Sequence, residues 1–146
     1  MKTMMIAVFV TLIATCALAQ TDEQKRNEKW QHEGLQQEEY TRYVPAGTKR
    51  EIQFIYGSDT DCVPMDGIEV RITTQPEHGT IEVVTGEGWS AWPKENLRFK
   101  CNAKKTRGQI VKYKAEKGYT GPDVFEVLIL FPRGYAREIR WNLNVK

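Results

Sequence analysis

The chain has 146 residues, which is room for one domain of ordinary size. Its 21 lysines and arginines nearly balance its 19 aspartates and glutamates, so the net charge is only +2. No stretch carries a marked basic excess, which argues against a protein that binds nucleic acid or an anionic membrane surface.

The first nineteen residues have the pattern of a cleaved signal peptide. Lys2 gives a positive start, the run from Met4 is apolar, and Ala17-Leu18-Ala19 supplies the small residues that a signal peptidase recognises. The sequence therefore predicts an exported protein, periplasmic or secreted, whose mature chain begins near Gln20. The apolar run is too short to span a bilayer comfortably, so no transmembrane segment is expected in the mature chain.

A different interpretation makes Cys16 a lipid-modified cysteine, because the residues before it loosely resemble a lipobox. Thr15 fits that motif poorly, and the apolar run continues past the cysteine. Cleavage after Ala19 is the preferred interpretation.

The segment 20–46 differs from the rest of the mature chain. It is polar, and the apolar residues within it are widely spaced: Trp30, Leu35, Tyr40 and Tyr43. A helix here would have only a thin apolar stripe, so residues 20–44 are predicted to form a helical or disordered arm. Such an arm is either a solvated leader or a tether that binds a partner.

From Lys49 onward apolar and polar residues alternate, which is typical of half-buried strands. Seven strands are expected, around residues 52–56, 68–72, 81–83, 97–101, 111–115, 124–131 and 139–145. Turn residues separate the predicted strands, among them Gly86-Glu87-Gly88. The expected fold of residues 47–146 is all-β, an antiparallel sandwich of about seven strands, with an up-and-down barrel as the alternative.

Two cysteines remain after removal of the signal peptide, Cys62 and Cys101. In an exported protein such a pair predicts a disulfide rather than a redox or metal site. In the predicted strand at residues 97–101 the side chain of Cys101 falls on the buried face.

Two segments, Gln75–Ile81 and Tyr113–Phe125, resemble the bacterial immunoglobulin-like and cadherin-like modules of surface and secreted proteins. The first is similar to the Pro-x-His-Gly-Thr-Val hairpin of that family, and the second to its Gly-Tyr-x-Gly-x-Asp-x-Phe motif. The resemblance covers residues 75–125 in a single copy and implies an immunoglobulin-like sandwich. It departs from the family pattern at Ala115, where proline is usual, and in the long segment from Gly86 to Gly108.

The resemblance implies structural roles for five residues: His78, Gly79, Tyr119, Gly121 and Asp123. The two glycines would permit turns that a side chain would block, and Asp123 would accept hydrogen bonds from loop amides. Tyr119 resembles a tyrosine corner, whose ring packs while its hydroxyl bonds to the loop. These roles concern the fold and say little about function.

The candidate binding residues are Trp89 and Trp92, in a segment bounded by glycines and a proline. Two tryptophans so placed could form an exposed platform for a sugar ring or for a partner protein. The alternative is that one or both rings cap the core of the sandwich.

No pattern in the chain predicts catalysis, a cofactor or a metal. The sequence contains no Gly-x-Ser-x-Gly, His-Glu-x-x-His or phosphate-binding motif. Asp59, Asp61 and Asp66 are close in sequence but are explained equally well as turn residues. A pair among Glu77, Glu87 and Glu95 could cleave a glycoside if those carboxylates converged.

The function expected from the sequence is therefore an exported, non-enzymatic binding or structural module of the cell envelope that interacts with a protein. The first alternative is a module that binds envelope polysaccharide through the Trp89 and Trp92 loop. The second alternative is a small secreted hydrolase.

Overall fold

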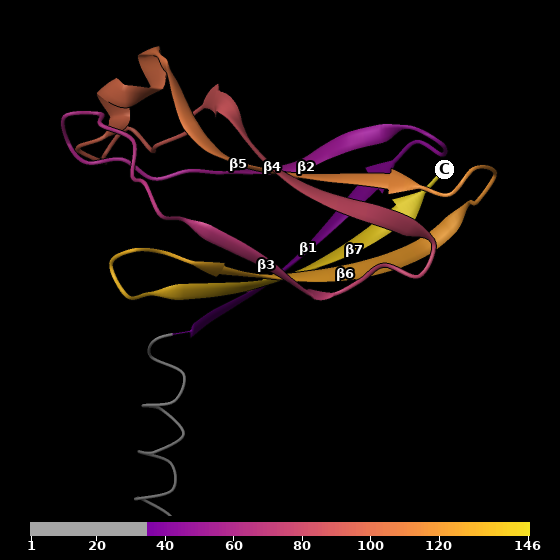
Figure 1. Cartoon of the computed structure of the whole chain (residues 1–146). Coiled ribbons are helices and arrows are strands. Elements are labelled where there is room, and N and C mark those ends of the chain that lie inside the picture. Colours follow the sequence, from indigo (N-terminus) through magenta and orange to yellow (C-terminus); the bar gives the residue numbers. More distant parts are fainter. Residues whose placement is uncertain (1–34) are drawn as a thin grey trace, which may run out of the picture. The chain divides into compact units, whose positions relative to one another are not determined.

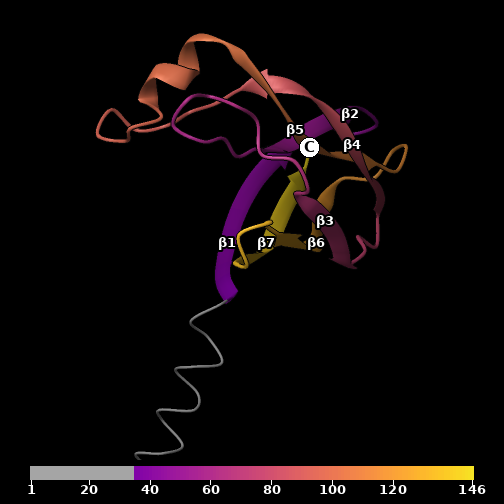
Figure 2. The same cartoon turned by 60° about the vertical axis from the view of Figure 1, so that its left-hand side comes forward.

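The computed structural model describes residues 35–146, which form two β-sheets. The strands are β1 (Leu35–Val44), β2 (Lys49–Ile55), β3 (Glu69–Thr74), β4 (Gly79–Trp89), β5 (Lys105–Ala115), β6 (Gly121–Leu130) and β7 (Ala136–Val145), with one short 3-10 helix, η1 (Phe99–Ala103). One sheet has the order β1-β7-β6-β3 and the other has the order β2-β5-β4 (Figure 1). The sheets lie face to face, as the turned view in Figure 2 shows.

In the four-stranded sheet, β6 and β7 form a regular antiparallel pair and β3 pairs with the other edge of β6. β1 runs parallel to β7. The amide of Lys146 donates to the carbonyl of Val44 at 3.0 Å, and the carbonyl of Lys146 accepts from the amide of Ala46 at 2.8 Å. Lys146 thus bonds to the residues on either side of Pro45, and this arrangement is typical of parallel strands.

In the three-stranded sheet, β5 is central and both of its partners are antiparallel. The pairing of β4 with β5 is continuous from Gly79↔Ala115 to Trp89↔Lys105. The pairing of β2 with β5 shifts between Glu51 and Gln53, where an extra residue bends the strand.

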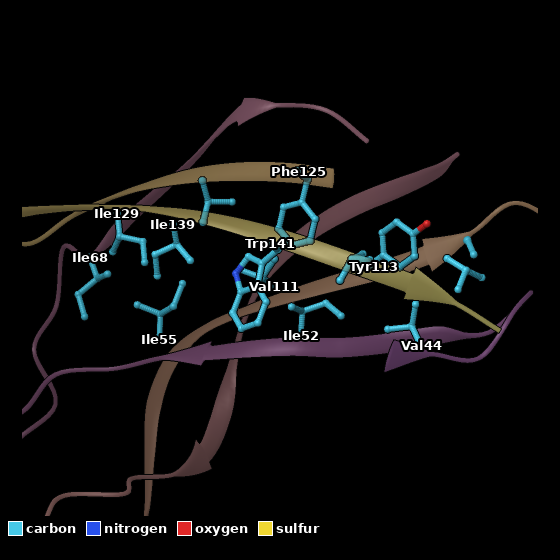
Figure 3. Packing of buried hydrophobic residues seen from close by; sticks show 14 of the residues in the cluster. Val44, Ile52, Ile55, Ile68, Val111, Tyr113, Phe125, Ile129, Ile139 and Trp141 are labelled. Atoms are coloured by element: carbon cyan, nitrogen blue, oxygen red, sulfur yellow. The ribbon is translucent and has the colours of Figure 1, made fainter. Parts of the chain in front are cut away.

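The core lies between the two sheets and is formed by alternate residues of the strands. Figure 3 shows the apolar side chains of both sheets meeting in this layer. The largest fully buried side chains are Tyr113, Phe125, Ile52, Ile129, Ile139, Leu143, Val111 and Val127. Alternation of buried and exposed residues along the strands is the pattern from which the sequence predicted strands, and it explains why that prediction succeeded.

The prediction of an all-β sandwich is confirmed, and the barrel alternative is wrong because the strands form two separate sheets. The disulfide between Cys62 and Cys101 is also confirmed, with 5.3 Å between the two Cα atoms. The signal peptide, Cys16 and the arm as far as residue 34 lie outside the described residues.

The structure differs from the prediction at residues 35–44. This segment was expected to belong to a helical or disordered arm, but it forms β1, the edge strand beside β7. Only Val44 of β1 is buried, so the strand lacks the apolar alternation that would have marked it. Glu38 forms an ion pair with Arg137 of β7, and such contacts, rather than burial, hold this strand.

The segment Gly86-Glu87-Gly88 was expected to be a turn, and this expectation is wrong. It continues β4 as far as Trp89. The glycines leave room for side chains that lie across the outer face of the sheet. A Cβ atom on Gly88 would lie 2.8 Å from the ring of Phe54, and one on Gly86 would lie 2.5 Å from Cδ1 of Ile110.

A strand was expected at residues 97–101, and this too is wrong. The chain there forms η1 and the turn before it, with Leu97 and Phe99 exposed. Cys101 is buried as expected, with 4% of its surface exposed. The alternation of three apolar and two basic residues was too short to distinguish a strand from a helical turn.

Candidate functional site

The disulfide joins two long loops at the same end of the sheets (Figure 1). One loop, residues 56–68, connects β2 to β3, and the other, residues 90–104, connects β4 to β5. We call them the stapled loops. They contain both predicted cysteines and Trp92, and Trp89 lies directly at the root of the second loop.

The first stapled loop contains a tight turn organised by Asp59. Its carboxylate accepts hydrogen bonds from the amides of Asp61 and Val63, both at 2.9 Å. The amide of Asp59 in turn donates to the carbonyl of Val63 at 3.1 Å. Cys62 lies inside this turn with a φ of +65°, a conformation that few residues other than glycine adopt. Asp59 therefore serves the loop backbone, which agrees with its interpretation as a turn residue.

The second stapled loop is organised by Asn102. The side-chain oxygen of Asn102 accepts from the amide of Trp92 at 3.0 Å and from the hydroxyl of Ser90 at 2.9 Å. Its side-chain nitrogen donates to the carbonyl of Trp92 at 2.9 Å. One half-buried amide side chain thus fixes the path of residues 90–92. Asn102 was not among the residues predicted from the sequence, because a single asparagine in a loop has no distinguishing pattern.

The two predicted binding residues have different surroundings. Trp92 is half-buried: its ring meets the ring of Tyr56 edge-on at 5.4 Å, and the guanidinium of Arg98 lies 5.4 Å from its centroid. Arg98 also donates to the carbonyl of Ser58 at 2.7 Å, which links the two stapled loops. Trp92 therefore packs within the loops, while 59% of the surface of Trp89 is exposed.

Other large apolar side chains are exposed on the same loops. Leu97 is 80% exposed, Val63 is 58% exposed and Phe99 is 44% exposed. We call these three residues and Trp89 the apolar loop residues. Val63 and Phe99 lie one and two positions from the cysteines of the disulfide, so the covalent bond holds their segments next to each other. Large apolar side chains exposed on an ordered loop are candidates for an interaction site.

The charges around the apolar loop residues are mixed. The second loop and the first residue of β5 carry exposed lysines at positions 94, 100, 104 and 105, whereas the first loop carries Asp59, Asp61 and Asp66. Lys100 lies 4.0 Å from Asp61, and Arg107 of β5 lies 3.5 Å from Asp66. A polar rim of both signs around apolar residues is the usual anatomy of a protein–protein interface.

The residues with implied structural roles gather elsewhere, where the loops before β4 and before β6 meet. The buried carboxylate of Asp123 accepts from the amides of Glu77 at 3.0 Å and His78 at 3.2 Å, and from its neighbour Val124 at 2.9 Å. It also accepts from the hydroxyl of Tyr113 at 2.7 Å. Four donors satisfy this charge without a cation, and they bind the loop before β4 to β6.

Tyr119 packs its ring on the ring of His78, with 4.0 Å between centroids and 15° between planes. Its hydroxyl donates to the carbonyl of Pro122 at 2.5 Å, three residues downstream. Gly121 has a φ of +139°, which favours glycine, and a Cβ on Gly79 would lie 2.4 Å from the ring of Tyr113.

The pKa of Tyr113 lies well above its ordinary value. Burial of the hydroxyl is the larger cause, and its hydrogen bond to the Asp123 carboxylate is the next. Tyr113 therefore stays protonated and remains a donor to Asp123 throughout the physiological range.

An open groove of about 530 Å³ lies beside this cluster. It is lined by polar residues, among them His78, Tyr119, Glu77, Glu126 and Arg140. Hydrogen bonds from Thr74 and Arg140 hold the pKa of Glu126 below its usual range. The imidazole Nδ1 of His78 lies 4.0 Å from a carboxylate oxygen of Glu116. No nucleophile and base are in contact among these described residues, as a hydrolase of the serine type would require.

The three glutamates considered for glycoside cleavage do not form one cluster, because Glu77 lies far from Glu87. Glu77 precedes β4 and Glu87 lies near its far end, so roughly 30 Å of extended chain separates them at about 3.3 Å per residue. Catalytic carboxylate pairs of glycosidases lie within about 10 Å of each other.

Residues 35–146 contain no group of three or more histidine, cysteine, aspartate or glutamate side chains that could hold a metal ion. Within the same residues no helix is long and apolar enough to cross a membrane.

The sequence matches no known protein family and none of the curated proteins with which it was compared. Among solved structures, it is similar to the solution structure of Amebosin. The identity is 12%, the alignment covers 76% of this chain and 98% of that chain, and the TM-score is 0.39. A likeness this loose carries no argument about fold or function.

Proposed function

We propose that this chain is an exported, non-enzymatic binding module of the cell envelope, with an immunoglobulin-like fold, that binds a protein partner through the apolar loop residues. The observation that carries the proposal is Leu97, which is 80% exposed on a loop that a disulfide and internal hydrogen bonds hold in place. An ordered loop loses little conformational freedom on binding, so its apolar surface is available for affinity.

The strand order supports the immunoglobulin-like part of the proposal. In such domains the second, fifth and fourth strands form one sheet and the third, sixth and seventh strands belong to the other. The two sheets of this chain have these members, with β1 added beside β7. The resemblance of residues 75–125 to bacterial immunoglobulin-like and cadherin-like modules points the same way.

Export is supported by the signal-peptide pattern of residues 1–19 and by the disulfide, because structural disulfides persist mainly in oxidising compartments. The periplasm and the extracellular space both fit. A polysaccharide ligand is less well supported, because Trp92 packs against Tyr56 and Arg98 and does not form a two-ring platform with Trp89.

The test is capture of partners from the native envelope extract with tagged mature protein. We compare the wild type with a Trp89→Ala/Leu97→Ser variant, which removes exposed groups and should leave the fold intact. The matched control is Tyr43→Ser, because Tyr43 is 68% exposed but lies on β1, away from the stapled loops. Captured proteins are identified by mass spectrometry, purified and titrated against all three proteins.

A purified partner that binds the wild type and Tyr43→Ser equally, and the loop variant at least ten times more weakly, supports the proposal. A partner that binds all three proteins with the same affinity would place the contact surface elsewhere. Absence of any partner, together with turnover of a substrate, would contradict a non-enzymatic role.

A further inference from the structure

Each sheet has two edge strands, and three of the four edges carry features that discourage the addition of another strand. β2 has a bulge after Glu51 and begins with Lys49 and Arg50. β3 is only six residues long, contains Arg71 and has a shift in its pairing near its end. Bulges, basic residues and short length are the usual protections of a sheet edge.

β1 is protected by inward-pointing charges. Glu38 forms an ion pair with Arg137, and the guanidinium of Arg42 lies 5.3 Å from the ring centroid of the buried Trp141. Pro45 directly follows the strand. A strand added at this edge would meet charged side chains on the face that must be buried.

β4 lacks the bulge, the basic residues, the proline and the short length that protect the other edges, and it carries only two acidic residues. It is eleven residues long, its pairing with β5 has no bulge, and it contains no lysine, arginine or proline. No described strand pairs with its second edge. Its charged residues are Glu82 and Glu87.

The hydrogen-bonding pattern identifies the free backbone groups. The amide of Glu116 donates to the carbonyl of His78 at 2.9 Å, one step beyond the pair Gly79↔Ala115. In antiparallel pairing every second residue bonds to the same partner strand. The even-numbered residues of β4 therefore bond to β5, and six residues direct their N–H and C=O groups to the free edge: Gly79, Ile81, Val83, Thr85, Glu87 and Trp89.

We propose that the free edge of β4 binds an extended segment of a partner protein as an added β-strand, and that this segment is basic. Backbone hydrogen bonds give affinity in this mode of recognition, and side chains on the added strand give specificity. The proposal rests on the proposed function, because Trp89 ends β4 and belongs to the apolar loop residues.

The charges of β4 select a basic segment over a second copy of the chain. The carboxylate of Glu82 bonds to Lys49 at 2.7 Å, whereas Glu87 forms no ion pair with the described residues. Two β4 strands side by side would bring two Glu87 carboxylates to a shared edge, and β4 itself has no lysine or arginine to pair with them. Like charges across paired strands are destabilising, and opposite charges are stabilising.

The experiment uses a display library of random decapeptides selected on the wild-type mature protein. The key variant is Thr85→Pro, which removes an N–H that faces the free edge and costs no hydrogen bond to β5. Thr85→Val is the matched control, since it keeps the N–H and removes only the hydroxyl that contacts Gln109. Glu87→Lys is a second variant, which changes an exposed side chain and tests the charge.

Selected peptides should be rich in lysine or arginine and bind Thr85→Val as tightly as the wild type. They should bind both Thr85→Pro and Glu87→Lys at least ten times more weakly. The bound peptide should also slow hydrogen exchange at the amides of Ile81 and Val83. Peptides that bind Thr85→Pro and Glu87→Lys as tightly as the wild type, peptides without basic residues, or no selected peptide would overturn the inference.

Three further outcomes bear on this inference and on the proposed function. A concentration-dependent dimer that Thr85→Pro abolishes would assign the edge to a second copy and overturn the basic segment. A purified partner that binds Thr85→Pro normally but is lost by Trp89→Ala/Leu97→Ser would leave the proposed function standing and refute the added strand. If basic peptides bind at β4 but no partner is captured through the apolar loop residues, the proposed function is refuted and the added strand at β4 is not.

Discussion

The hydroxyl of Tyr113 donates a 2.7 Å hydrogen bond to the carboxylate of Asp123, and both residues are buried, with 1% and 5% of their surfaces exposed. Tyr113 belongs to the three-stranded sheet and Asp123 to the four-stranded sheet, so this bond connects the two layers. The amides of Glu77 and His78 bond to the same carboxylate. One buried charge therefore fixes both sheets and the loop that leads into β4.

Replacement of Asp123 should be among the most destabilising polar substitutions in the domain. Asp123→Asn replaces an acceptor oxygen with a donor group that faces the donors already present, and it removes the charge that strengthens each bond. We expect a loss of about 3 kcal/mol in the free energy of unfolding, measured by urea denaturation. Tyr113→Phe removes only one of the four donors and should cost about 1–2 kcal/mol. Equal losses for the two variants would contradict the assignment of Asp123 as the shared acceptor.

The disulfide should contribute substantially to stability. It closes a loop with a sequence separation of 39 residues, for which the chain-entropy model gives a stabilisation of about 4 kcal/mol. The Cys62→Ser/Cys101→Ser variant should therefore unfold at markedly lower urea concentration and temperature than the wild type. An unchanged midpoint of urea unfolding would show that the stapled loops are not coupled to the stability of the domain.

Gly88 of β4 should be intolerant of alanine because of one aromatic ring. A Cβ on Gly88 would lie 2.8 Å from ring atoms of Phe54. We expect Gly88→Ala to destabilise the domain by about 1–3 kcal/mol through overpacking. In the background Phe54→Leu, where the ring is absent, the same substitution should cost much less. A cost that is equal in both backgrounds would exclude the ring as the cause.

The strands of the core were predictable because burial on one face imposes a two-residue period on the sequence. The alternation at Val111 and Tyr113 shows this period directly. The disulfide was predictable for a different reason, because two cysteines remain in the predicted mature chain. β1 gave no such signal, because its stability depends on contacts with β7 that a single sequence does not display. The same holds at Gly88, where glycine usually indicates a turn but here makes room for Phe54 from a strand two positions away in the sheet.

The candidate site was predictable only in outline. The tryptophans drew attention to the correct loop, but their exposure depends on neighbours that the sequence does not reveal. Trp92 packs against Tyr56, which lies 36 positions earlier in the chain, and its backbone is held by Asn102. Leu97 and Phe99 had an apolar alternation typical of a strand, and only the structure shows that a turn and the short helix η1 place them on the surface.

The ion pair of Glu38 with Arg137 makes the attachment of β1 dependent on pH. Burial raises the pKa of the Glu38 carboxyl, but hydrogen bonds from Arg137 and Tyr40 and the charge of Arg137 outweigh it. The pKa in the folded protein is therefore below its usual value, so the contribution to stability is fully present above the unfolded pKa of about 4.3 and disappears as the pH falls through the folded value. Glu38→Gln should lower the free energy of unfolding at pH 7 by about 1–2 kcal/mol, and this difference should shrink as the pH falls below the unfolded pKa. Urea denaturation of the wild type and Glu38→Gln between pH 7 and pH 3 measures it. Glu39→Gln is the control, because the Glu39 carboxylate accepts its hydrogen bond from the neutral side-chain amide of Asn142. A difference between wild type and Glu38→Gln that is the same at pH 7 and pH 3 would mean that the charge of Glu38 does not hold β1 to β7.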